Sequence, residues 1–231
     1  MKTGLLLVLI AFSSLAQARE PRFTVVRVDT RTQDLRLFLG DEQGVPFHRF
    51  AKLEAWLKPQ GMRLRFAMNA GMYEPDYSPV GLFVADGKAM TPLNLADGKG
   101  NFYLKPNGVF LVTDAGPRVV ESTQYPTVAR DVRLATQSGP LLLRDGAIHP
   151  GFDRASTSRH IRNAVGVNGD TAYFVISDEP VTFYELALYF RDTLHCANAL
   201  YLDGAISSLY APDLGRRDAK SRLGPIIGVV E

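Results

Sequence analysis

Short stretches in which polar and apolar residues alternate run through the first part of the chain. Arg22–Val28, Leu35–Leu39 and Arg63–Met68 show this period of two, which is typical of β-strands with one face on a core. Between the second and third stretch, His48–Leu57 changes to helical spacing and ends before Pro59. The pattern therefore predicts strands on either side of a helix.

The middle of the chain consists of short apolar runs separated by tight turns. Gly81–Val84, Val109–Thr113 and Leu141–Leu143 are each followed by a turn that contains Asp and Gly. Asn168-Gly169 is the strongest hairpin signal in the chain, because an Asn-Gly pair readily adopts the backbone of a two-residue turn. We expect antiparallel strands on both sides of it, over Ala164–Val167 and Thr171–Ile176.

The last third of the chain contains the longest helical pattern. Over Val181–Leu194, apolar side chains fall on one face and charged side chains on the other. The apolar run Ala199–Leu202 then stops at Asp203, and Pro225–Val230 has the pattern of a closing strand. Together the elements predict a single α+β domain, in which a curved mixed or antiparallel β-sheet carries a few packed helices.

The N-terminus has the features of an export signal. Lys2 supplies a positive charge, Gly4–Leu15 an apolar stretch, and residues 16–18 the small-x-small pattern of a cleavage site. The apolar stretch is shorter than the roughly 18 to 20 residues that cross a bilayer. We expect residues 1–18 to be a signal peptide and residues 19–231 the mature domain. The protein would then be periplasmic or secreted, with no stable membrane span after cleavage.

Charge and cysteine content narrow the classes of function. The 231-residue chain has a formal net charge of +2 and is rich in both signs, which favours a small neutral or anionic ligand and no nucleic-acid partner. A single cysteine, Cys196, cannot close an internal disulfide, and its apolar neighbours predict an inert buried thiol. Walker loops, dinucleotide-binding glycine patterns, zincin helices and cysteine pairs are missing. We therefore predict no cofactor and no metal site, while a cation held by oxygen ligands near Asp203 stays open.

Polar residues and glycines interrupt two of the predicted strands. One strand runs into Asn69, Ala70 and Gly71, where exposed backbone N–H groups can hold an anion or a sugar hydroxyl, or simply form a turn. A second apolar run is broken at Gln137-Ser138-Gly139. A bend there would aim both polar side chains into a cleft, or the stretch would be a bulge at a sheet edge. Ser138 lacks the flanking glycines of a nucleophile elbow, so a serine hydrolase is disfavoured.

Two further motifs carry charge. Arg159 and Arg162 belong to a basic cluster, and the planar guanidinium group matches phosphate oxygens, although a solvated surface run is the common alternative. Asp203 follows a buried apolar run. A carboxylate there is poorly explained by stability, so we favour a catalytic or binding role over an aspartate that bonds its own turn.

Taken together and in this order, the motifs resemble the phosphodiester glycosidase family over about residues 60 to 231. Several long matches in one order are more specific than any single motif. The segments that carry the resemblance are MNAGMYEPDYSPVGLFVADGK, GNFYLKPNGVFLV, ATQSGPLLLRDGAIHP, RHIRNAVGV and FRDTLHCANALYLDGAISSLY. Other members have glycines where this chain has Ala70 and Ala205, so the floor of the pocket and the sugar can differ.

The resemblance implies an exported hydrolase that cleaves a glycosyl phosphodiester between the sugar C1 and the phosphate oxygen. In such a reaction a carboxylate near C1 stabilises the positive charge of the transition state, and cationic groups neutralise the leaving phosphate. A non-catalytic periplasmic module that binds a sugar phosphate or an envelope polysaccharide is the alternative. Matched to the motifs, the catalytic carboxylate is Asp203, with Asp76 and then Glu74 as candidates for a second one; the substrate-binding residues are Asn69, Gly71, Gln137, Ser138, Gly139, Arg159, Arg162, Gly204 and Ser207.

Overall fold

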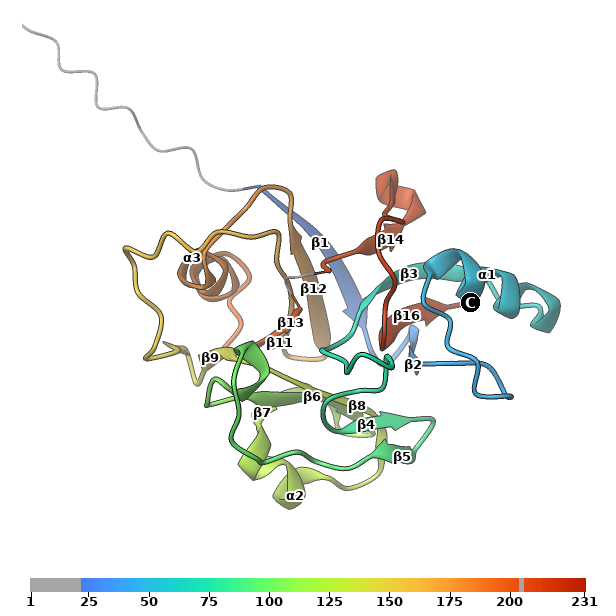
Figure 1. Ribbon diagram of the computed structural model, residues 1–231, viewed down its shortest axis with the longest axis horizontal. Helices are drawn as coiled ribbons and strands as arrows, with labels where there is room; N and C mark the ends of the chain where they lie inside the picture. Colours follow the sequence, from blue (N-terminus) through green and yellow to red (C-terminus); the bar gives the residue numbers. More distant parts are fainter. Residues whose placement is uncertain (1–21, 204–205) are drawn as a thin grey trace, which may run out of the picture.

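The computed structural model describes residues 22–203 and 206–231, and its strands form three antiparallel sheets (Figure 1). The predicted α+β class is confirmed. The strands are divided among three sheets instead of lying in one curved sheet, because irregular connections such as residues 70–82 carry the chain from one sheet into the next. The signal peptide predicted for residues 1–18, and Gly204, lie outside the described residues.

The first sheet contains the hairpin that the Asn-Gly pair predicts, with Asn168 opposite Thr171. Its strand order is β1-β12-β11-β13-β9-β10. The strands are β1 (Phe23–Asp29), β9 (Leu141–Arg144), β10 (Ala147–Ile148), β11 (Asn163–Asn168), β12 (Thr171–Ser177) and β13 (Asn198–Asp203).

The second sheet places the predicted closing strand in its interior, between β3 and β2. Helix α1 (Phe50–Leu57) packs on this sheet through Phe50, Leu53 and Leu57. The order is β15-β14-β3-β16-β2, with β2 (Asp34–Phe38), β3 (Leu64–Asn69), β14 (Leu209–Ala211), β15 (Arg216–Arg217) and β16 (Ile226–Val230).

The third sheet is built from the middle of the chain, and the short helix α2 (Tyr125–Val128) follows its edge strand β7. The order is β5-β4-β8-β6-β7. The strands are β4 (Phe83–Ala85), β5 (Lys88–Thr91), β6 (Gly108–Thr113), β7 (Gly116–Glu121) and β8 (Val132–Ser138).

One apolar core lies between the three sheets. The ring of Phe174 on β12 lies 5.0 Å from the ring of Phe66 on β3 and 5.7 Å from that of Phe110 on β6, measured between centroids. All three rings are buried and belong to the same cluster of side chains. Burial of this cluster from water therefore holds the sheets together.

Helix α3 (Phe183–Leu188) begins two residues after the predicted start and continues as a π-helical turn over Tyr189–Thr193. Thr182 caps it: the Thr182 hydroxyl accepts a hydrogen bond from the Glu185 N–H, and the Glu185 carboxylate accepts one from the Thr182 N–H. Leu186, Ala187 and Phe190 bury this segment against the first sheet.

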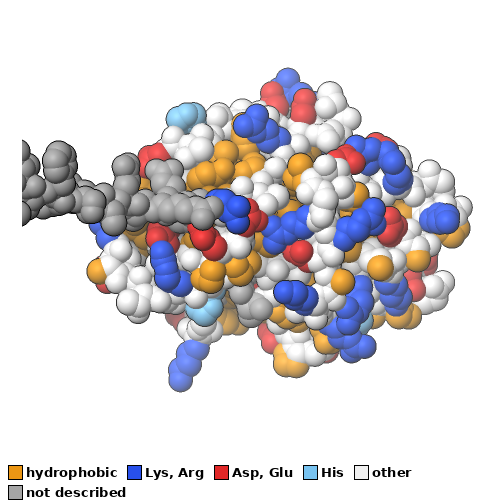
Figure 2. Space-filling view, turned by 90° about the horizontal axis from the view of Figure 1, so that it is seen from above, with side chains coloured by type: hydrophobic (Ala, Val, Ile, Leu, Met, Phe, Trp, Pro, Cys, Tyr) orange, Lys and Arg blue, Asp and Glu red, His pale blue; other side chains and the backbone are white. Residues whose placement is uncertain are grey.

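Charges of both signs are interspersed over the surface seen in Figure 2, where Lys and Arg side chains lie among Asp and Glu side chains. Arg216, for example, lies between Asp178 at 2.8 Å and Asp218 at 3.1 Å. None of the helices in the described parts of the chain combines the length and apolar character that crossing a bilayer requires.

Candidate functional site

A cleft of about 490 Å³ lies beside Asp203, the last residue of β13. Its walls come from the segment after β3, from the segment before β6 and from the end of β13. The lining residues are Met72, Tyr73, Glu74, Val80, Lys99, Gly100, Asn101, Phe102, Tyr103, Asp203 and Ile206. A smaller cavity of about 150 Å³ lies between α1 and β14 and contains none of the residues that the sequence predicts for the site.

Two buried asparagines join the first and second sheets at the base of this site. Asn163, the first residue of β11, donates from Nδ2 to the carbonyl of Asn69 at 3.0 Å. The Asn163 Oδ1 accepts from the Asp203 N–H at 3.1 Å, and the Asn69 Oδ1 accepts from the Ser208 N–H at 2.9 Å. These bonds hold the backbone on both sides of residues 204–205, so the predicted residue Asn69 shares a network with Asp203.

Ser207 belongs to the same network. Its hydroxyl donates to the Asp203 carbonyl at 2.7 Å and lies 3.1 Å from the Ile161 carbonyl. The side chain is not among those that line the cleft. Ser207 therefore acts on the backbone of Asp203, and the structure brings these two predicted residues together.

Asp203 is only 7% exposed. Its negative charge raises the pKa of two nearby tyrosines. Burial first, and the negative charge of Asp203 second, raise the pKa of Tyr73 to about 12. Burial and Asp203 also raise the pKa of Tyr201, which Arg162 acts to lower. Asp203 thus lies close enough to both hydroxyls for its charge to be felt.

Of the two acids expected beside Asp203, the structure places Glu74 on the cleft and Asp76 outside it. The Asp76 Oδ1 accepts hydrogen bonds from the Ser78 hydroxyl at 2.6 Å and from the Ser78 N–H at 2.9 Å. These bonds hold the pKa of Asp76 below its usual value and turn the carboxylate toward its own loop.

The side chains of Gln137 and Ser138 form hydrogen bonds inside the protein and do not line the cleft. The Gln137 Oε1 accepts from the N–H groups of Leu82 and Asn94, and its Nε2 donates to the Asn94 carbonyl at 2.7 Å. The Ser138 hydroxyl donates to the Leu202 carbonyl at 2.8 Å. Neither side chain points into the cleft, because β8 continues as a paired strand through Ser138 and the chain turns only at the next residue.

Two of the three predicted glycines, Gly71 and Gly139, lie in the described part of the chain and allow close packing near the cleft. A Cβ at Gly139 would lie 2.6 Å from the Phe102 carbonyl oxygen, so no side chain fits there. Gly71 has a φ of +152°, and a Cβ on it would lie 3.1 Å from the Thr136 hydroxyl. Both positions let the segments that form the cleft walls lie directly on β8.

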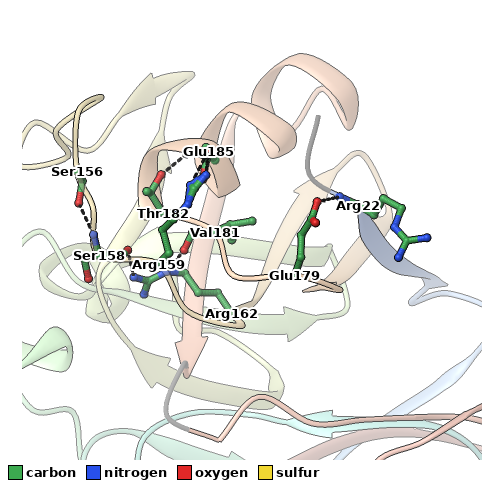
Figure 3. Close-up of polar contacts among 9 residues, drawn as sticks. All are labelled: Arg22, Ser156, Ser158, Arg159, Arg162, Glu179, Val181, Thr182 and Glu185. Atoms are coloured by element: carbon green, nitrogen blue, oxygen red, sulfur yellow. Dashed lines mark hydrogen bonds and ion pairs between the residues drawn. The ribbon is translucent and has the colours of Figure 1, made fainter. Parts of the chain in front are cut away.

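Neither of the two arginines lines the cleft. Both lie beside the residues at the start of α3 (Figure 3). Arg159 is partly exposed and forms an ion pair with Glu185, with N–O distances of 2.5 to 2.9 Å. Arg162 is 2% exposed, donates from Nε to the Val181 carbonyl at 2.9 Å, and stacks 3.8 Å from the ring centroid of Phe183. The expected phosphate clamp of these two side chains is therefore not formed directly.

Arg162 nevertheless connects to the cleft through Tyr201. Its Nη1 lies 3.4 Å from the Tyr201 hydroxyl. Burial raises the pKa of Tyr201, and Arg162 and Asn101 both act to lower it. Asn101 lines the cleft, so Tyr201, which shares a face of β13 with Asp203, responds to the buried arginine and to a cleft residue.

Histidine, cysteine and acidic side chains do not gather into a metal-binding group of three or more within residues 22–203 and 206–231.

Comparison with known proteins decides the family. The family model for phosphodiester glycosidases matches residues 62–229, which is most of the chain. The chain belongs to the phosphodiester glycosidase family. It is also 34% identical over 194 residues to YigE, an uncharacterized Escherichia coli K12 protein, covering 83% of this chain and 76% of YigE.

Solved structures show the same fold. The zebrafish N-acetylglucosamine-1-phosphodiester alpha-N-acetylglucosaminidase catalytic domain, auto-inhibited by its pro-peptide, superposes with a TM-score of 0.59 at 14% identity. This match covers 94% of this chain and 84% of the zebrafish chain. A hypothetical protein from Synechocystis matches with a TM-score of 0.53 at 17% identity, over 90% of this chain and 59% of that one.

Proposed function

We propose that this family member is an exported hydrolase that cleaves a glycosyl phosphodiester between the sugar C1 and the phosphate oxygen. Family membership supports a glycosidase-type enzyme. Export is proposed from the charged and apolar pattern of residues 1–18. The single observation that carries the proposal is the position of Asp203, a buried carboxylate at the end of a strand that lines a cleft large enough for a sugar.

Asp203 is proposed to act at the anomeric carbon. As the glycosidic bond breaks, positive charge develops on the sugar ring, and a nearby carboxylate stabilises it as nucleophile or as base. The Asn69, Asn163 and Ser207 network holds the Asp203 backbone and so fixes where that carboxylate stands. Low exposure of the carboxylate strengthens its electrostatic effect on the sugar.

Glu74 is proposed as the second carboxyl in place of Asp76. It lines the same cleft from the opposite segment, whereas the Asp76 carboxylate is occupied by Ser78. Tyr73 offers a fixed aromatic face: its ring stacks on Tyr77 with centroids 5.4 Å apart, and its hydroxyl donates to the Arg222 carbonyl at 3.0 Å. A sugar ring can pack against such a face.

The test is release of free sugar from benzyl phosphodiesters of N-acetylglucosamine 1-phosphate and glucose 1-phosphate. N-acetylglucosamine is included because the structurally similar zebrafish enzyme is named for it. We expect turnover by the wild type and a loss of about 10² to 10⁴ in kcat for Asp203→Asn. Asp76→Asn is the matched control, and its kcat should stay within about twofold because that carboxylate lies off the cleft.

The same assay separates the enzyme from the non-catalytic alternative. Binding of either phosphodiester without release of sugar by the wild type would show that the cleft belongs to a binding module. Equal turnover by wild type and Asp203→Asn would remove Asp203 from the reaction.

A further inference from the structure

The charges that line the cleft are unfavourable for a phosphate group unless one particular side chain offsets them. Glu74 and Asp203 contribute two carboxylates, and Lys99 contributes the one cation among the described lining residues. A phosphodiester carries a negative charge, which both carboxylates repel. Since Arg159 and Arg162 do not line the cleft, Lys99 is the cation that an entering phosphate meets.

The segment that carries Lys99 is held in one conformation by close packing. A Cβ on Gly98 would lie 2.7 Å from the ring of Tyr103, so Gly98 and Tyr103 are in direct contact. Gly100 adopts a φ of +92°, which favours glycine, and the chain then forms a short 3₁₀ turn over Asn101–Tyr103. Lys99 is therefore presented from a fixed loop, as a binding residue needs to be.

Bonds between neighbouring residues of this loop hold it together. Phe102 is buried, and its carbonyl accepts from the Asn107 Nδ2 at 2.9 Å. Lys105 donates to the Leu95 carbonyl at 3.0 Å and pairs with Asp97 at 2.6 Å. The two lysines of this loop differ. Lys105 forms an ion pair within the loop, whereas Lys99 forms none with the described residues.

The same loop offers a second donor. Asn101, two positions after Lys99, also lines the cleft, and its side-chain amide can donate hydrogen bonds. An anion held by Lys99 and Asn101 would gain from both the ammonium group and the amide.

We propose that Lys99 and Asn101 hold the phosphate of the substrate and that Asp203 faces the anomeric carbon. The assignment rests on the proposed function and moves the phosphate site from the arginines to the loop before β6. Chemically, the ligand is a phosphate ester or free phosphate, and the sugar is recognised elsewhere in the cleft.

The experiment measures binding of inorganic phosphate and of glucose 1-phosphate by calorimetry, which needs no turnover. For Lys99→Ala we expect a loss of about ten- to thirtyfold in affinity for both ligands, the size of one charge-assisted contact. Lys99→Arg should retain most of the affinity. Lys88→Ala, which removes another exposed lysine away from the cleft, should bind as the wild type does.

The role of Asn101 has its own readout. Asn101→Ala removes the amide that lines the cleft beside Lys99, so phosphate affinity should fall by about threefold or more while the melting temperature changes little, because Asn101 is exposed. Unchanged affinity of Asn101→Ala would overturn that part of the assignment.

The outcomes distinguish this assignment from the proposed function. If Lys99→Ala binds phosphate as tightly as the wild type, or the wild type binds none, the assignment is overturned, whether or not the wild type releases sugar. If Lys99→Ala loses affinity but the wild type releases no sugar from the phosphodiesters, the phosphate site stands and the hydrolase proposal fails.

Discussion

Among individual residues, Asp203 depends on Asn163, whose Oδ1 accepts a hydrogen bond from the Asp203 N–H at 3.1 Å. An acid that ends an apolar run is unusual enough to be noticed, and it lies on the cleft. Asn163 opens a strand directly after Arg162, where a polar residue suggests only a strand boundary. Its role depends on Asn69, which is 94 positions away in the chain, and local pattern carries no information on such a contact.

Arg159 and Arg162 show the same limit of prediction from local sequence. Sequence alone groups Arg159 with Arg162, but the first is paired on the surface and the second is buried among carbonyls and aromatic rings. Burial of a charge depends on tertiary packing, which the spacing of two residues does not determine.

These environments predict losses of stability that differ in size. Arg159→Ala removes an exposed ion pair and should lower the free energy of unfolding by no more than about 1 kcal/mol. Arg162→Ala leaves a cavity and removes the hydrogen bonds to the Val181 and Ser158 carbonyls, and should cost about 3 kcal/mol. Urea denaturation of both variants measures the difference. Equal destabilisation would contradict the environments described for the two side chains.

Among the elements, the loop between β5 and β6 was the least predictable. The strands found by their period of two lie within two residues of their predicted bounds, as β1 and β3 illustrate. The stretch before β6 has no periodic pattern, yet it forms the wall of the cleft that carries Lys99 and Asn101. The Gln137 side chain on β8 holds this stretch through hydrogen bonds to the backbone of Asn94, which is 43 positions away in the chain.

Gln137 therefore offers a test of how the loop is held. Gln137→Ala leaves the N–H groups of Leu82 and Asn94 without their acceptor, and we expect a loss of about 2 to 4 kcal/mol in stability together with faster proteolysis between residues 92 and 104. Gln124→Ala, at an exposed position, is the control. Protease resistance equal to the wild type would show that the wall does not depend on Gln137.

For the whole molecule, sequence predicted the α+β class but not the division into three sheets. That division depends on pairings such as β3 with β14 and β16, whose partners lie far apart in the chain. The hydrophobic period of a strand determines which of its faces is buried. It does not determine which strands pair with it. The common core around Phe174 is likewise a product of long-range packing.

The single thiol reports on that packing as a function of pH. Burial raises the pKa of Cys196 from 9.0 to about 12. Above pH 9 the unfolded chain ionises while the folded chain stays protonated, so this contribution to stability is complete below pH 9 and is lost as the pH rises to 12. The loss amounts to about 4 kcal/mol for Cys196 alone.

Denaturant melts at several pH values between 8 and 11 measure this effect. The free energy of unfolding should fall more steeply with pH for the wild type than for Cys196→Ala, which lacks the ionisable group. Parallel curves for the two proteins would show that the thiol is exposed to solvent in the folded state.

The central claim is that the bond broken joins the sugar C1 to oxygen, with Asp203 beside that carbon. Hydrolysis of a sugar 1-phosphodiester in ¹⁸O-labelled water, followed by mass spectrometry of both products, tests it most directly. Attack at C1 places the label in the released sugar and leaves the phosphate monoester unlabelled. Label in the phosphate product would mean that the phosphorus–oxygen bond breaks, and would contradict the proposed role of Asp203.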